Sequence, residues 1–134
     1  MYNVRINYDC IRELLIVLED NLIINDNLDL PKIYFKDIEQ NPIMRKYSRA
    51  DIAYSAQILF ETDFIDCRII YSDNQIENIV FFSITFAGHQ YIESIKNDTL
   101  WNKLKSKIIN HGLSLSFELI KSTAIPLAVA MLNS

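Results

Sequence analysis

The sequence is poor in the two residues that tight turns and long loops use most. Only 2 glycines and 3 prolines occur in 134 residues. Glycine supplies backbone conformations with positive φ, and proline fixes the geometry of many turns. Their scarcity disfavours loop-rich and closely turned all-β architectures, so we expect helices joined by short connections with a small sheet.

Cysteine is also scarce, and Cys10 and Cys67 are the only two. Their wide separation gives neither a disulfide framework nor a metal-binding spacing, which predicts two buried free thiols in a reducing compartment. The N-terminus has no uninterrupted apolar stretch followed by a cleavage site, so no secretory signal is expected. The expected location is therefore the cytoplasm.

The residues that most enzymes and metal proteins need are few. His89 and His111 are the only histidines, and no cluster of His, Cys, Asp and Glu has the spacing of a metal site. No nucleophile elbow, phosphate-binding loop or dinucleotide fingerprint is present. We therefore predict that the protein is not an enzyme and uses neither a metal ion nor a cofactor.

Positive charge is in deficit, because 13 Lys and Arg face 17 Asp and Glu and the net charge is −4. Nucleic-acid binders of this size are more often basic, since contacts to phosphate supply much of their affinity. Local patches matter more than the total charge, so this balance disfavours DNA binding without excluding it.

What the sequence does have is the composition of a globular domain, with 50% hydrophobic and 22% charged residues. Apolar residues recur at steps of three and four over residues 7–21, 48–62, 85–95 and 100–110, which predicts four helices. Thr85 is expected to cap the third of them, and residues 97–99 break the chain before the fourth. Residues 65–71 and 76–85 are β-prone and flank a polar turn, which predicts a hairpin. Residues 32–35 are expected to form a short edge strand, and 36–46 are ambiguous.

The order of these elements predicts an α+β fold of the winged helix-turn-helix type with additional C-terminal helices. Ser48 to Asp51 has the form of a capping box and predicts the start of the DNA-reading helix. The buried face of this helix is expected to end at Phe60. The hairpin would be the wing. We expect a winged-helix domain over residues 1–112. Residues 113–134, with a helix starting at Ser114, would belong to that domain or form a dimerisation element.

Two stretches in the second half resemble a known family. They are Ile84-Thr85-Phe86-Ala87-Gly88-His89-Gln90-Tyr91-Ile92 and Asn97-Asp98-Thr99-Leu100-Trp101-Asn102-Lys103. They are similar to the Leu-Thr-x-x-Gly-His and Asp-Asp-Thr-x-Trp-Asn-Lys turns of an uncharacterised phage and bacterial family, domain of unknown function 2513. Asn97 departs from the first acidic residue of the second turn. The resemblance covers about residues 7–120 and implies a winged-helix fold in a phage or prophage setting, with no assigned activity.

The first functional hypothesis is a phage-type, DNA-binding transcriptional regulator. In such readers the second helix of the pair enters the major groove and its outward side chains contact base edges, while cations around it contact phosphates. The candidate DNA-binding residues are Arg45, Lys46, Arg49, Tyr54, Ser55, Gln57 and Arg68.

The alternative hypothesis is a non-enzymatic protein-binding module or adaptor that acts on a host protein. Asp51 and Glu61 lie on or beside the same helix face and would repel phosphate. Ile58 would add an exposed apolar residue to that face. The two hypotheses remain open at this point.

The apolar C-terminal segment predicts a second kind of contact. Glu118 and Lys121 interrupt it, so we expect no membrane span, although association with a membrane surface remains a minor alternative. A helix that packs against its counterpart in a second subunit fits better, and a homodimer is expected. The candidate dimerisation residues are Phe117, Ile120, Ala124, Leu127, Ala128 and Met131.

Overall fold

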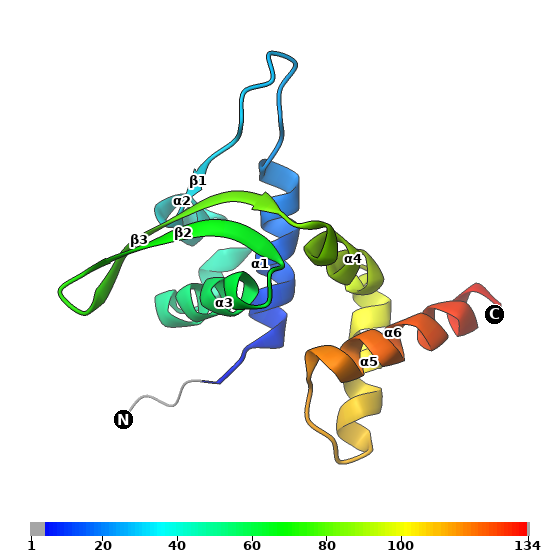
Figure 1. Cartoon of the computed structure of the whole chain (residues 1–134). Coiled ribbons are helices and arrows are strands. Elements are labelled where there is room, and N and C mark those ends of the chain that lie inside the picture. Colours follow the sequence, from blue (N-terminus) through cyan, green and yellow to red (C-terminus); the bar gives the residue numbers. More distant parts are fainter. Residues whose placement is uncertain (1–4, 134) are drawn as a thin grey trace. The chain divides into compact units, whose positions relative to one another are not determined.

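The computed structural model describes residues 5–133, which form a mixed α+β structure (Figure 1). This part of the chain contains six α-helices, one 3-10 turn and a three-stranded antiparallel sheet. It divides into two compact units, of which the first ends at His89 and the second begins at Gln90. The predicted α+β class is confirmed, whereas the predicted boundary at residue 112 stays a prediction.

The first unit begins with helix α1 (Tyr8–Asn21), as the apolar periodicity predicts. The side chain of Asn7 caps it by accepting a hydrogen bond of 3.0 Å from the Cys10 N–H, which satisfies one of the free donors at the helix start. The buried face of α1 includes Ile11, Leu14 and Leu18 and packs against α3 and β3.

Two short helical pieces fill the segment that the sequence left ambiguous. They are α2 (Phe35–Gln40) and the 3-10 turn η1 (Met44–Lys46), which contribute buried Phe35, Ile38 and Met44 to the core. Asn41 between them is extended, as expected for the residue before Pro42.

Helix α3 (Arg49–Glu61) starts where the capping sequence predicts. The Ser48 hydroxyl accepts a hydrogen bond of 3.1 Å from the Asp51 N–H. The Asp51 carboxylate accepts a hydrogen bond of 3.4 Å from the Asn7 side chain, so the starts of α1 and α3 are tied to each other.

The sheet consists of β1 (Ile33–Tyr34), β2 (Ile65–Ser72) and β3 (Gln75–Ile84) in the order β1-β3-β2. The predicted hairpin and edge strand are both confirmed. Asp73 and Asn74 form the two-residue hairpin turn with φ values of 50° and 63°. Two successive left-handed residues are typical of the type I′ turn, which matches the twist of the strands it joins.

Helix α4 (Phe86–Ile95) follows β3 and contains the boundary between the two units. The predicted cap is confirmed, because the Thr85 hydroxyl accepts a hydrogen bond of 3.1 Å from the Gly88 N–H. The same hydroxyl donates to the Asp63 carbonyl at 2.6 Å.

The second unit continues with α5 (Asp98–Asn110) and α6 (Phe117–Leu132), which pack against each other. Asn97 caps α5, Gly112 ends it with a φ of 74°, and Trp101 is buried. The predicted start of the last helix at Ser114 is wrong, because the side chain of Ser116 accepts from the Leu119 N–H and caps α6.

Candidate partner-binding site

The predicted DNA-binding residues lie in two places in the first unit. Arg45, Lys46 and Arg49 are exposed and lie together, on η1 and at the start of α3. Gln57 and Arg68 line a separate open pocket of about 390 Å³ between α3 and β2. Tyr54 is half-buried on α3. The structure therefore brings five of the seven residues into two groups and not into one continuous patch, and Tyr54 and Ser55 belong to neither group.

Two expectations about the faces of α3 are wrong. Ser55 was expected to point outward but is only 2% exposed, and its side chain hydrogen-bonds the thiol of Cys10 on α1. Phe60 was expected to point inward but is exposed and lines the pocket beside β2. The helical period alone does not locate the edges of the buried face of α3. Because Ser55 is buried, it is no longer a candidate contact residue.

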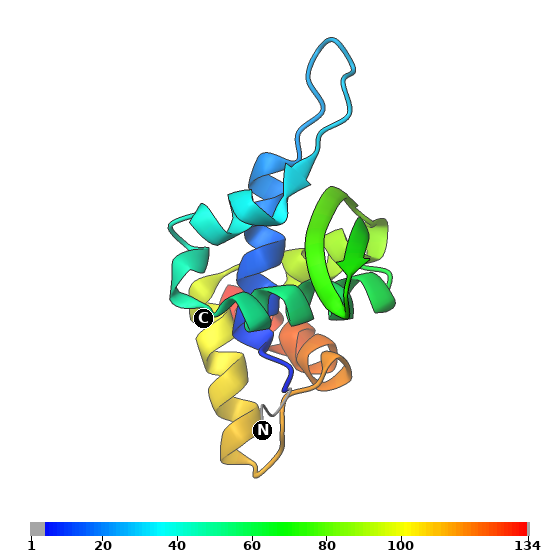
Figure 2. The same cartoon turned by 90° about the vertical axis from the view of Figure 1, so that its left-hand side faces the viewer.

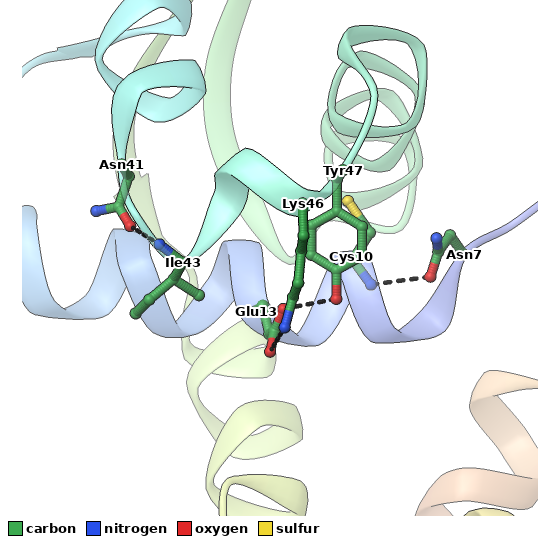
Figure 3. Close-up of polar contacts among 7 residues, drawn as sticks. All are labelled: Asn7, Cys10, Glu13, Asn41, Ile43, Lys46 and Tyr47. Carbon is green, nitrogen blue, oxygen red and sulfur yellow. Dashed lines mark hydrogen bonds and ion pairs between the residues drawn. The ribbon is translucent and has the colours of Figure 1, made fainter.

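Two of the candidate cations are held by carboxylates of the same unit. Lys46 Nζ lies 2.8 Å from Glu13 Oε1, and Arg49 Nε lies 2.8 Å from Glu39 Oε2. Figure 3 shows the Glu13 carboxylate shared between Lys46 and the hydroxyl of Tyr47. Exposed ion pairs of this kind are weak and can be exchanged for a phosphate, but they lower the positive potential that a nucleic acid would meet.

The surrounding charge is unfavourable for phosphate. From residue 45 to residue 84, which spans η1, α3 and the hairpin, the chain has 4 Lys and Arg and 6 Asp and Glu. The hairpin turn includes Asp73 and is followed by Glu77. A wing that approaches a DNA backbone usually offers cations, so the charges of this face favour a different kind of partner.

Four exposed, large apolar side chains of the first unit lie on one loop, residues 22–32 between α1 and β1. This loop projects from the end of α1 (Figures 1 and 2). Ile23, Ile24, Leu28 and Leu30 are all exposed, with 78% exposure for Leu28 and 79% for Leu30. Four large apolar side chains on one projecting loop are unusual for a monomer surface and mark it as a candidate contact region.

The tip of this loop is held by its own hydrogen bonds. The Asn25 side-chain oxygen accepts from the N–H groups of Asn27 and Asp29 at 3.0 Å, and its amide donates to the Asp29 carboxylate at 3.0 Å. The Leu28 N–H donates to the Asn25 carbonyl at 2.9 Å. This turn places Leu28 in the left-handed region, with a φ of 64°.

An open, mainly apolar pocket of about 250 Å³ lies at the base of the loop. Its lining combines the two ends of the loop with the end of β3, and includes Leu22, Ile24, Leu30, Pro31, Phe82 and Ile84. At its rim, His89 Nδ1 lies 3.4 Å from Glu19 Oε2. Loop 22–32 and this pocket together form what we call the loop site.

Sequence reasoning missed the loop site. The Asn- and Asp-rich composition of residues 21–29 indicates only a polar loop that ends the first helix. The signal was present in the apolar residues Ile23, Ile24, Leu28 and Leu30, which lie among Asn and Asp residues in a stretch that the sequence assigns to no helix or strand. Large apolar residues outside the predicted elements have no obvious place in a core, and they can be read as contact residues.

The predicted dimerisation face of α6 needs a correction. Ile120 and Ala124 are buried within the chain, and Phe117, Leu127, Ala128 and Met131 are half-buried. The exposed apolar stripe of α6 consists instead of Ile125, Val129 and Leu132. Ile120 and Ala124 therefore pack within the chain, and a dimer contact through the other four residues stays a prediction.

Residues 5–133 lack two further kinds of feature. Nowhere in this range do three or more His, Cys, Asp or Glu side chains gather as they would around a metal ion. None of its helices has the combined length and apolar character that crossing a membrane requires.

Comparison with known proteins places the chain in a family. Residues 5–114 match the family described as "Hypothetical protein (DUF2513)". An uncharacterized protein of Haemophilus influenzae is 29% identical over 126 residues, which cover 94% of this chain and 97% of the relative. No solved structure matches the chain. The chain belongs to the DUF2513 family.

Proposed function

We propose that the chain is a non-enzymatic protein-binding module whose first unit is a winged helix. The order α1-β1-α2-α3-β2-β3, with β3 between β1 and β2, supports the scaffold, because a helix pair followed directly by a hairpin defines the winged helix-turn-helix. In this proposal the loop site contacts the partner, which is a host protein in a phage or prophage setting.

A single residue, Leu28, carries the proposal. Its φ of 64° is unfavourable for a side chain with a Cβ by roughly 1–2 kcal/mol, and Gly or Asn would fit this turn better. Its side chain is also 78% exposed, so burial within the chain does not offset that cost. A strained, exposed, large apolar residue contributes little to folding, and contact with a partner explains both features.

The charges near the loop indicate the surface chemistry expected of the partner. Asp20, Asp26 and Asp29 lie in and beside loop 22–32, against Lys32 at its end. A surface that combines exposed apolar side chains with acidic neighbours is complementary to an apolar groove with a basic rim. We expect the apolar contact to supply most of the affinity and the carboxylates to affect the association rate.

The test compares two surface variants as bait for host proteins under chemical crosslinking. The loop variant has Ile24→Asn, Leu28→Asn and Leu30→Asn, and the control has Val129→Asn and Leu132→Asn on α6. Proteins captured by the wild type and the control but lost with the loop variant would support the proposal. Retention of the same proteins by the loop variant would contradict it.

DNA binding is the second candidate, and the exposed start of α3 favours it. Arg45 and Arg49 are exposed there, and the Arg49 side chain remains 77% exposed despite its ion pair with Glu39. The experiment is fluorescence anisotropy with fragments from upstream of the gene, over a salt titration. Affinity that falls steeply with salt and is lost on Arg45→Ala with Arg49→Ala would support a regulator. Equal binding by that double variant would exclude this contact surface.

A further inference from the structure

Strand β2 presents a long free edge. It has eight residues and, within residues 5–133, pairs only with β3, whereas β1 on the other side of β3 has two residues. In the pairing of β2 with β3, Phe82 and Glu77 have no partner residue in β2. Both unpaired residues belong to β3, so every residue of β2 is paired in sequence. A regular edge strand offers unpaired N–H and C=O groups that pair with another extended strand.

Two opposite charges lie on the exposed face of this edge strand. Asp66 and Arg68 are separated by one residue and are both exposed, while Ile65 and Cys67 between and beside them are buried. Neither Asp66 nor Arg68 has an ion pair or side-chain hydrogen bond with any other residue in the range 5–133. Their charges are therefore available to a partner strand.

We propose that β2 pairs antiparallel with β2 of a second copy of this chain, about a two-fold axis at Cys67. Residues that face each other in an antiparallel pair lie on the same side of the sheet, so the exposed residues of one strand face the exposed residues of the other. In this register Asp66 of each copy lies opposite Arg68 of the other. The interface is isologous and contains two equivalent ion pairs.

The neighbouring registers are disfavoured by charge. A two-fold axis at Arg68 places two arginines opposite each other, and an axis at Asp66 places two aspartates opposite each other. Like charges directly opposite on a sheet destabilise the pair, whereas opposite charges stabilise it. A register that is displaced by one residue would place exposed residues of one strand opposite buried residues of the other. The Asp66-Cys67-Arg68 sequence therefore selects the register centred on Cys67.

The surroundings of β2 supply further surface for the second copy. Phe60 on α3 and Tyr71 on β2 are exposed and line the open pocket of about 390 Å³ between these elements. A strand added to the edge would place alternate side chains beside this pocket and would cover apolar area on both rings. The proposal goes beyond the protein-binding function, because the loop site lies between α1 and β1 and not at this edge.

The test is a charge exchange measured by sedimentation equilibrium of the full chain, over about 1 to 500 µM. We expect the wild type to dimerise with increasing concentration. Asp66→Arg and Arg68→Asp should each raise the dissociation constant about tenfold or more, because each creates like-charge pairs. An equimolar mixture of the two single variants should form a heterodimer, and the double exchange should restore the homodimer.

Several outcomes would overturn the proposal. A wild type that stays monomeric over this range excludes self-association, and a strand from another protein would then be the alternative for this edge. A dimer that both single variants keep unchanged would place the contact elsewhere, with the α6 stripe of Ile125, Val129 and Leu132 as the first alternative. Because Asp66 and Arg68 are exposed and unpaired within residues 5–133, thermal unfolding should show both variants folded.

Discussion

The hydroxyl of Tyr47 donates a hydrogen bond of 2.5 Å to the carboxylate of Glu13 and so joins the end of η1 to α1 (Figure 3). The next residue, Ser48, caps α3. A half-buried contact therefore fixes the direction in which the chain enters α3, the helix that lines the pocket beside β2. Hydrogen bonds to a charged group are among the stronger polar contacts in proteins.

Tyr47→Phe removes this bond, and we expect the free energy of unfolding to fall by about 1.5–3 kcal/mol at neutral pH. Chemical denaturation of the two proteins measures the difference. Tyr71→Phe is the matched control, because Tyr71 is exposed and its hydroxyl lies 3.5 Å from Gln57. Equal losses for the two variants would show that the Glu13 contact contributes nothing specific.

Alkaline pH should weaken the fold through the same residue. Burial, together with the hydrogen bond to Glu13 and its charge, raises the pKa of Tyr47 well above its ordinary value. A raised pKa means that the folded state prefers the neutral hydroxyl. Its contribution is fully present below the unfolded pKa of about 10 and is lost at higher pH. As the pH rises above about 10, the denaturant concentration at the midpoint of unfolding should decrease. The decrease should be smaller for Tyr47→Phe.

The two thiols should be unreactive in the folded protein. Burial raises the pKa of Cys10 to about 11 and that of Cys67 to about 11. Thiolate is the reactive form, so little of it exists at neutral pH even where a reagent gains access. Titration with a chromogenic disulfide should label both thiols in denaturant and neither rapidly without it. Rapid labelling of the native protein would contradict the burial of these side chains.

Gly88→Ala should be the more damaging of the two glycine substitutions. A Cβ at Gly88 would lie 2.0 Å from the Phe64 carbonyl oxygen, so the start of α4 would have to move away from the residue that precedes β2. We expect a loss of about 3 kcal/mol or more in unfolding free energy. At Gly112 a Cβ would meet no atom within 4 Å, so only the φ of 74° disfavours alanine there. We expect Gly112→Ala to lower the unfolding free energy by about 1 kcal/mol. Thermal unfolding of both variants checks the order.

Leu28→Gly should stabilise the protein while it weakens partner binding. Glycine adopts a φ of 64° without steric cost, and the exposed leucine side chain contributes no packing. We expect a gain of up to about 1 kcal/mol in unfolding free energy, partly offset by the entropy of glycine in the unfolded chain. Denaturation and capture of host proteins should be measured on the same sample. A variant that loses stability would show that Leu28 has a folding role.

Local patterns in the sequence predicted most of the secondary structure. Ser48 and Thr85 were identified as caps because a cap depends on the next three residues alone. The β-hairpin was also visible, because its strands and turn are contiguous.

Contacts between distant segments could not be predicted in this way. Ser55 is buried because Cys10 of α1 lies beside it, and Arg49 is paired because α2 brings Glu39 close. The loop site was missed because the strain at Leu28 is a property of backbone geometry, which residue type alone does not reveal. Secondary structure was therefore predicted better than the environments of the candidate site residues.

The central position of β3 also affects how the protein is made. Strand β1 leaves the ribosome early, but its partner is β3, which is synthesised after α2, α3 and β2. Ile33 and Tyr34 therefore have no strand to pair with until Phe81 and Val80 have emerged. During translation the exposed apolar loop before β1 is present on a nascent chain whose sheet is incomplete. That interval therefore favours early contact with a partner or a chaperone.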